Sequence, residues 1–290
     1  MAYGKVDPIR SLAARDLRSL LRLLRSPEKV AFGELIRLWK ARDQEQWSRL
    51  PAAYTLLAER MLREGEPLVA YDVVREGLHL VGSNIRLRQL QGIALARSGS
   101  SMRAGEIFSQ LRAERHLDEE TLGMLARTYK DAAMHAADPK AKRRFLQKAA
   151  IAYENGYRLS RGFWTGINAA TMALLLSRKT HAGVLAGEIR KICLRALRQE
   201  RNDRFWLFAT LGEAALVTQQ WSEAEDWYRQ AGDISERRFG DLQSSRRNAR
   251  LLLDFWRGSH GDRNLSAHSV GGGVCRAYDR RARSRPTTIS

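Results

Sequence analysis

The sequence is poor in cysteine, which can cross-link a chain, and in proline, which restricts its backbone. It has only two cysteines and six prolines in 290 residues. Cys193 lies in the apolar stretch 192–194, Cys275 lies near a run of glycines, and neither has a CxxC partner. This usage argues against a disulfide framework, a structural zinc site and a thiol redox motif. It favours a reducing, intracellular setting, and we expect a cytoplasmic protein.

Long hydrophobic runs and metal-type histidine spacings are also missing. Apolar runs such as 173–176 are far shorter than the roughly 20 residues that cross a bilayer. Charged residues interrupt the segment 7–25, so we expect neither a secretory signal nor a transmembrane segment. The six histidines include no i, i+4 pair and fit no carboxylate–histidine–nucleophile set. We therefore expect no metal, no cofactor and no catalytic residue.

Acidic residues are the scarcer charge. There are 32 Asp and Glu against 50 Lys and Arg, which gives a formal net charge of +18. Such an excess favours anionic partners, namely nucleic acid, acidic protein surfaces or anionic lipid. The alternative is that the arginines are spread over solvated helix faces and serve solubility. The hydrophobic fraction of 44% is ordinary for a soluble globular protein.

A register of 34 residues runs through the first half of the chain. Ala58 and Val74 recur as Gly92 and Phe108, 34 residues later in each case. A small residue opposite a bulky one lets two short helices cross closely. This period and pattern are typical of the tetratricopeptide repeat, a helix–turn–helix unit.

The register predicts about five helical hairpins and a closing helix. Turns are expected at 65–67 and at Gly99, where a residue tolerant of positive φ or unable to extend a helix is needed. In the third hairpin, Pro139 favours an exposed loop within an insertion at 134–140. The predicted units are 51–84, 85–118, a third ending near 156, 162–198, a fifth around Gly212, Ala224 and Tyr228, and a last helix at 241–257.

We therefore expect an all-α fold, a right-handed α-solenoid of about five tetratricopeptide-like hairpins. Residues 1–50 form N-terminal cap helices, with binding of the basic helix near 12–25 to a membrane or an acidic partner as the alternative. The solenoid spans 51–257. Residues 258–290 form a disordered basic tail, because they are rich in glycine and arginine and poor in apolar residues.

Three stretches resemble one known family. They are Tyr157 with 163–171 (FWTGINAAT), 203–214 (DRFWLFATLGEA, most of its residues) and 242–250 (LQSSRRNAR). Over roughly 120–257 the chain resembles the TRAF-binding, tetratricopeptide-like regulatory domain of mitogen-activated protein kinase kinase kinases and its bacterial relatives. The resemblance implies a regulatory or signalling interaction module. The kinase signatures themselves, a Gly-rich loop, HRD and DFG, are missing from this sequence.

Trp164, Asn168 and Thr171 are the first candidate partner-binding residues. An asparagine on the first helix of a repeat can hydrogen-bond the backbone of an extended peptide, and a tryptophan can stack on that peptide. The alternative is structural, since a buried asparagine can tie two helices together.

Arg246, Arg247 and Arg250 share one helix and form the second candidate group. Their planar guanidinium groups can bind phosphate or carboxylate through paired donors. They can equally cover a solvated face or pair with Glu223 and Glu225 of the neighbouring repeat. The same alternatives apply to Lys140, Lys142, Arg143 and Arg144 of the insertion. Trp206, Trp221 and Trp227 are interpreted as core residues.

Three functions remain open. The first is non-catalytic protein binding, with a peptide or partner helix in the concave groove of the solenoid. The second is nucleic-acid binding by basic helical repeats. In the third, the chain is the sensor part of a longer enzyme. Enzymatic activity within these residues is not expected, and the oligomeric state is not predicted.

Overall fold

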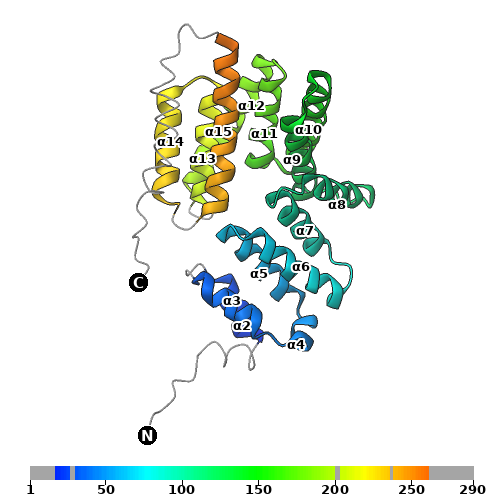
Figure 1. Ribbon diagram of the computed structural model, residues 1–290. Helices are drawn as coiled ribbons and strands as arrows, with labels where there is room; N and C mark the ends of the chain where they lie inside the picture. The colour runs from blue at the N-terminus through cyan, green and yellow to red at the C-terminus, as the bar shows by residue number, and fades with distance from the viewer. Residues whose placement is uncertain (1–16, 27–29, 200–202, 236–237, 261–290) are drawn as a thin grey trace, which may run out of the picture. The chain divides into compact units, whose positions relative to one another are not determined.

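The computed structural model describes residues 17–26, 30–199, 203–235 and 238–260 (Figure 1). In these ranges the regular secondary structure is helical and includes no strand, which confirms the all-α prediction. The chain divides into two compact units, 1–114 and 115–290, which we describe separately as unit 1 and unit 2. The last helix continues through His260, so residues 258–260 of the predicted tail are helical instead of disordered. The rest of that tail, 261–290, lies outside the described residues.

In its described residues, 17–26 and 30–114, unit 1 shows three N-terminal helices followed by two hairpins. In the first hairpin, Pro51 and Pro67 occupy the first turn of a helix, where a missing backbone N–H has no intrahelical partner to lose. Gly65 and Gly99 sit at the predicted turns with φ of 87° and 92°. The helices are α2 (Leu17–Arg25), α3 (Phe32–Lys40), α4 (Gln44–Ser48), α5 (Pro51–Glu64), α6 (Pro67–Val81), α7 (Ile85–Arg97) and α8 (Ser101–Ala113).

The small-and-bulky register corresponds to close helix crossings. A Cβ atom added to Gly92 in α7 would lie 2.5 Å from the ring of Phe108 in α8. The equivalent pair in unit 2 is Gly212 and Tyr228, where that Cβ would lie 2.8 Å from the ring. Only glycine permits this approach, which confirms the interpretation of the repeat.

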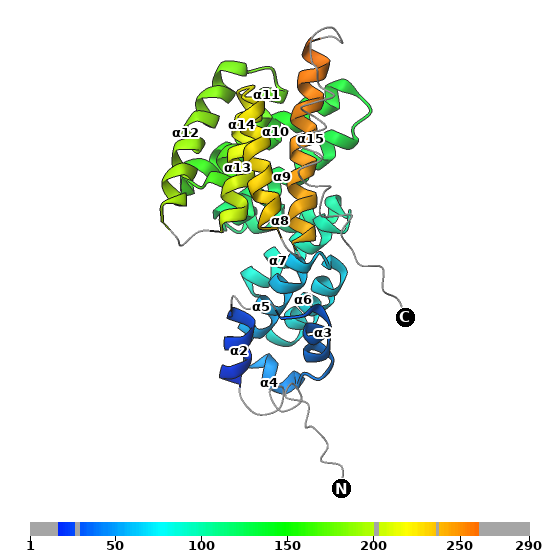
Figure 2. The same cartoon turned by 90° about the vertical axis from the view of Figure 1, so that its left-hand side faces the viewer.

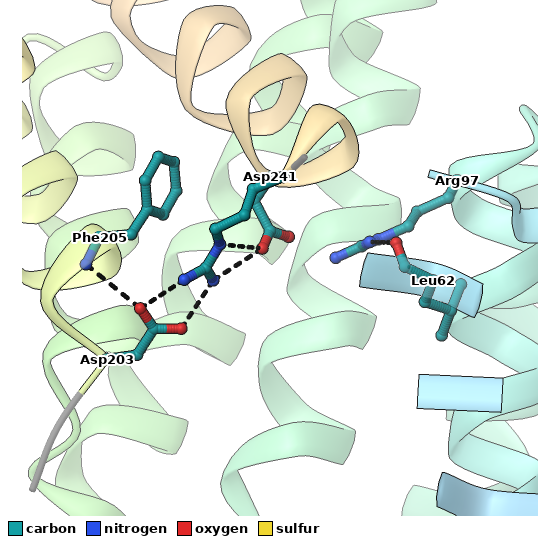
Figure 3. Close-up of polar contacts among 6 residues, drawn as sticks. Leu62, Arg97, Asp203, Phe205 and Asp241 are labelled. Carbon is teal, nitrogen blue, oxygen red and sulfur yellow. Dashed lines mark hydrogen bonds and ion pairs between the residues drawn. The ribbon is translucent and has the colours of Figure 1, made fainter. Parts of the chain in front are cut away.

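Two arginines, the buried Arg60 and the partly buried Arg97, join helices of unit 1 through backbone carbonyl groups. Arg97 at the end of α7 donates a 2.6 Å hydrogen bond to the Leu62 carbonyl of α5 (Figure 3). Arg60 of α5 donates to the Leu24 carbonyl at 3.1 Å and also to the carbonyl of Ser26. These arginines add side-chain hydrogen bonds to carbonyl groups near helix ends, where intrahelical partners run out. The Leu62 carbonyl also accepts a hydrogen bond from the Gly65 N–H.

Over the part of unit 2 that the structure describes, three hairpins are followed by a closing helix. The predicted loop at Pro139 is wrong, because Asp138 caps a helix and Pro139 begins it. The insertion lengthens this hairpin and places Lys140 and Arg144 on a helix. Pro139 stands at the first helical position, where proline is favoured. The helices are α9 (Glu119–His135), α10 (Pro139–Ser160), α11 (Phe163–Leu175), α12 (Lys179–Leu197), α13 (Arg204–Val217), α14 (Trp221–Asp233) and α15 (Phe239–His260).

One continuous core holds unit 2 together. It includes buried residues from α9 to α15, among them Ala126, Ile167, Leu211 and Trp256. The first helices α11 and α13 contact each other, and α15 lies against both of them (Figures 1 and 2). The closing helix thus covers part of the face that the first helices present.

Candidate functional site

The first helices of unit 2 and α15 surround a small polar cavity of about 50 Å³, which we call the polar pocket. It combines charged, amide and aromatic side chains from five helices. The volume suits a few water molecules or one small polar group and is well below that of a usual ligand pocket. Its lining includes Arg127, Lys130 and Asp131 of α9, Tyr153 of α10, Trp164 and Asn168 of α11, Trp206 and Glu213 of α13, and Arg247 and Asn248 of α15.

Lys130 is the central group of the pocket and is only 7% exposed. Its ammonium nitrogen donates hydrogen bonds to the Oδ1 atoms of Asn168 at 2.9 Å and Asn248 at 3.0 Å. It also lies 5.9 Å from the ring centroid of Tyr153. The hydrogen-bond acceptors of this buried cation are therefore two neutral amides.

Glu213 is the buried carboxylate of the same network. It accepts a 2.9 Å hydrogen bond from Thr171 Oγ1 and a 3.3 Å hydrogen bond from Asn248 Nδ2. Asn248 thus stands between Lys130 and Glu213 and contacts both. This arrangement joins α9, α11, α13 and α15 through polar side chains.

Burial dominates the electrostatics of this pair. It lowers the pKa of Lys130 to about 8, although the negative charges of Glu213 and Asp131 oppose the change. It raises the pKa of Glu213, against the opposing effects of Lys130 and of the hydrogen bonds from Thr171 and Asn248. In each case the charged form is disfavoured because water is excluded.

Two arginines, Arg127 and Arg247, line the pocket beside Lys130 and Glu213. Asp131 lies 3.9 Å from Arg127 and 4.0 Å from Arg247, at the outer limit of an ion pair. The Arg247 side chain is 54% exposed, whereas that of Arg127 is 14% exposed. Together with Lys130, the arginines give the pocket three positive groups against two carboxylates. The excess is positive.

The helix α15 is fixed to the rest of unit 2 at both ends as well as at Asn248. Before its first turn, Arg238 donates to both carboxylate oxygens of Asp203 at 2.6 Å and to Asp241 at 2.8 Å; Figure 3 shows the two carboxylates flanking the guanidinium group. Near its end, Trp256 Nε1 donates to the Leu216 carbonyl at 3.0 Å. These contacts hold α15 parallel to α13.

The structure brings Trp164, Asn168, Thr171 and Arg247 together in or beside the polar pocket. Trp164 packs on Gly123, where an added Cβ would lie 2.5 Å from the ring. Asn168 is buried and joins α11 to Lys130 of α9, as the structural alternative described. Thr171 reaches the pocket only through its hydrogen bond to Glu213.

Arg246 and Arg250 are outside the pocket lining, unlike Arg247 on the same helix. The expected alternative of pairing with Glu223 and Glu225 does not describe Arg247, which lies nearest Asp131. Those two glutamates are instead paired with Arg190 and Arg229. Trp206, Trp221 and Trp227 pack partly buried against core clusters.

Sequence reasoning missed Lys130, Glu213 and Asn248. A signal was present for Glu213, because it is the sole charged side chain in the apolar run 205–217. Such a residue on a buried helix requires a partner. Asn248 is 118 positions from Lys130 in the chain, and no local pattern pairs them.

The described residues hold no group of three or more His, Cys, Asp or Glu side chains that could bind a metal ion. None of the described helices is both long and apolar enough to cross a membrane.

A family model described as "Tetratricopeptide Repeats-Sensor" matches residues 68–173. Among solved structures, TTC0263, a thermophilic TPR protein of Thermus thermophilus, superposes with a TM-score of 0.53. It is 17% identical, and the match covers 73% of this chain and 100% of that chain. The fold is tetratricopeptide-like.

Structures of human IFIT1 are also similar to this chain, at 14% sequence identity. Its dimer solved with m7Gppp-AAAA gives a TM-score of 0.57 and that solved with PPP-AAAA gives 0.55. These matches cover 94% and 96% of this chain but only 64% and 65% of the IFIT1 chain. No curated protein sequence matches the chain.

Proposed function

We propose that the chain is a non-catalytic regulatory module that binds a protein partner along the first helices of unit 2. The polar pocket holds an acidic side chain of that partner. The supporting observation is the buried Lys130 ammonium, whose hydrogen bonds go to amide oxygens within a lining of net positive charge. An entering carboxylate would receive charge-assisted hydrogen bonds there.

The small cavity supports a side chain rather than a cofactor as the occupant. About 50 Å³ is too little for a nucleotide or a ring-containing cofactor, whereas a carboxylate group fits. The partly exposed Trp206 and Trp164 border the same opening and offer apolar contact to the rest of a peptide. Tryptophan and arginine are the residues that most often dominate binding energies at interfaces.

The closing helix supplies a second argument. α15 is an amphipathic helix that lies on α11 and α13 and inserts Asn248 between Lys130 and Glu213. This face is therefore chemically suited to a helix that presents one polar side chain to the pocket. A partner helix or extended peptide bound beside α15 would use the same mode of recognition.

Two likenesses support a regulatory purpose. The matched family model carries the word sensor in its description, and residues 120–257 resemble the regulatory region of mitogen-activated protein kinase kinase kinases. A cytoplasmic location is part of the proposal, because the cysteine usage suggests no disulfide framework. The thiol of Cys193 is buried, and burial raises its pKa to about 12, which makes it unreactive.

Nucleic acid is the alternative partner. The net charge of +18 supports it, as do the structurally similar IFIT1 chains solved with PPP-AAAA and m7Gppp-AAAA. At 14% identity that similarity concerns the fold, so the ligand class has to be tested directly.

A peptide-display selection on the immobilised full chain tests the proposal. We expect selected peptides to be enriched in Asp and Glu, and we expect Arg247→Gln and Arg127→Gln each to weaken their binding about tenfold through the lost charged hydrogen bond. Arg229→Gln, at an exposed ion pair on α14, is the matched control and should change affinity less than twofold. Selected peptides without acidic residues, bound equally by all variants, would contradict the proposal.

A further inference from the structure

The tip of the α9–α10 hairpin carries a dense group of positive charges away from the polar pocket lining. Residues 139–148 include five lysines and arginines and no Asp or Glu. All five side chains are exposed. We call this group the basic tip; it consists of Lys140, Lys142, Arg143, Arg144 and Lys148.

Part of the basic tip forms a straight ridge. Lys140, Arg144 and Lys148 are spaced by four residues, so they lie on one face of α10 about 6 Å apart along its axis. No carboxylate in the part of the chain that the structure describes forms an ion pair with these three. Many arginines elsewhere do have such partners, for example Arg42 with Glu76 and Arg190 with Glu223.

Two aromatic rings lie next to the ridge. The Lys148 ammonium is 5.7 Å from the ring centroid of Tyr129 on α9 and 5.9 Å from that of Phe145 on α10. Both rings are partly buried, so each retains some exposed surface. Cations beside partly exposed rings match the phosphates and bases of a single strand, since bases stack on aromatic side chains.

The chemistry favours nucleic acid over a lipid surface. A helix that lies in a membrane interface needs a free apolar face. The apolar face of α10, with Leu146, Ala149 and Tyr153, is buried in the core of unit 2. The exposed large hydrophobic side chains of α9 and α10 are Met134 at 36% and Ile151 and Leu159 at 62% each; they are spread along the hairpin and form no continuous apolar face.

We propose that the basic tip binds the phosphate backbone of single-stranded nucleic acid. This interaction is independent of the acidic peptide proposed for the polar pocket. The phosphates would contact Lys140, Arg144 and Lys148 along the ridge, and Tyr129 and Phe145 would contact a base. Three such contacts carry no base-specific hydrogen bonds, so binding should depend on salt and little on sequence.

Fluorescence anisotropy with a labelled dT20 oligonucleotide and the full chain tests the proposal. The triple variant Lys140→Gln, Arg144→Gln, Lys148→Gln should weaken binding about tenfold or more. It should also make the dependence of log K on log salt shallower by about 2, as three lost single-strand phosphate contacts require. Circular dichroism should show an unchanged helix content, because all three side chains are exposed.

The matched control removes the same charge from another helix. Lys191 and Arg195 on α12 and Arg198 at its C-cap are also exposed and similarly spaced. Their triple glutamine variant should stay within twofold of the wild type. All variants retain the arginine-rich sequence 276–285. Equal losses in both triple variants, or none in the first, would overturn the proposal. Tighter, tip-dependent binding to a duplex or to phosphatidylserine vesicles would overturn it as well.

Discussion

Units 1 and 2 use the same helical hairpins but place their charges differently. In unit 1, Arg42 forms an ion pair with Glu76, and both side chains keep contact with water at 17% and 16% exposure. In unit 2, Lys130 and Glu213 are 7% and 6% exposed and meet through an amide. The same repeat thus supports a partly buried ion pair, which we call the clamp, in one unit and a fully buried polar network in the other.

The unit 1 clamp has a clear structural role. Arg42 lies 3.4 Å from the centroid of the Trp39 ring and donates to Glu76 Oε1 at 2.6 Å. Tyr54 also donates to that carboxylate, at 3.1 Å. Burial raises the pKa of Glu76, but the contacts with Arg42 outweigh it and hold the pKa below its ordinary value. The N-terminal helices are thereby attached to the first hairpin.

The buried charges of unit 2 are not the arrangement that would give the chain the greatest stability. A buried ion pair costs desolvation energy that well-packed apolar residues would avoid. Lys130 nevertheless meets two amides on different helices, beside a cavity. Charge placement, rather than hairpin geometry, therefore distinguishes the part of this repeat stack where we propose that a ligand binds.

The largest effect should come from breaking the buried pair. Lys130→Met leaves Glu213 buried without its positive neighbour, and we expect the free energy of unfolding to fall by about 3 kcal/mol. Urea denaturation followed by circular dichroism measures this change. Lys191→Met, at an exposed position on α12, is the control and should stay within about 0.5 kcal/mol of the wild type.

A double variant separates charge from packing. Lys130→Met combined with Glu213→Gln removes both charges and keeps an acceptor for Thr171, so it should recover at least half of the loss. Additive losses would show that the two groups do not interact, and the contrast between the units would then disappear.

The pH dependence of stability should be the next largest effect. The pKa of Lys130 is about 8 in the folded chain against 10.5 for an ordinary lysine. Between these values the unfolded chain binds more protons, so stability rises with pH in this window. The gain relative to Lys130→Met should reach at most about 3 kcal/mol between pH 8 and 10.5. Urea midpoints across this range provide the measurement, and a flat or falling difference would contradict the burial of a charged lysine.

Sequence pattern predicted the hairpins because their determinants are local. Gly92 and Phe108 face each other, and each recurs 34 residues after its counterpart, so the register identifies both. Gly65 has the positive φ that its turn requires. The error at Pro139 had a local cause too. Proline at the first position of a helix and proline in a loop look alike in sequence, and Asp138 is the feature that distinguishes them.

The candidate site was only half predictable. Asn168 and Trp164 stood out as polar and aromatic residues in an unusual apolar stretch, and both line the pocket. Lys130 did not stand out, because a lysine beside an aspartate is typical of an exposed helix face. Its burial arises when α15 packs across the first helices and brings Asn248 to it. That contact depends on the stacking of several hairpins.

The smallest effect should come from an exposed pair in unit 1. Arg86 donates to Glu59 Oε1 from two nitrogens at 3.0 and 2.8 Å, but the side chains are 39% and 32% exposed. Water and salt screen such a pair, so Arg86→Gln should lower the free energy of unfolding by less than about 1 kcal/mol. Urea denaturation at low salt and at about 1 M sodium chloride measures the loss, which should shrink at the higher salt. A loss as large as that of Lys130→Met would mean that depth of burial does not determine how much a charged group contributes to stability, and the contrast between the exposed and the buried charges would fail.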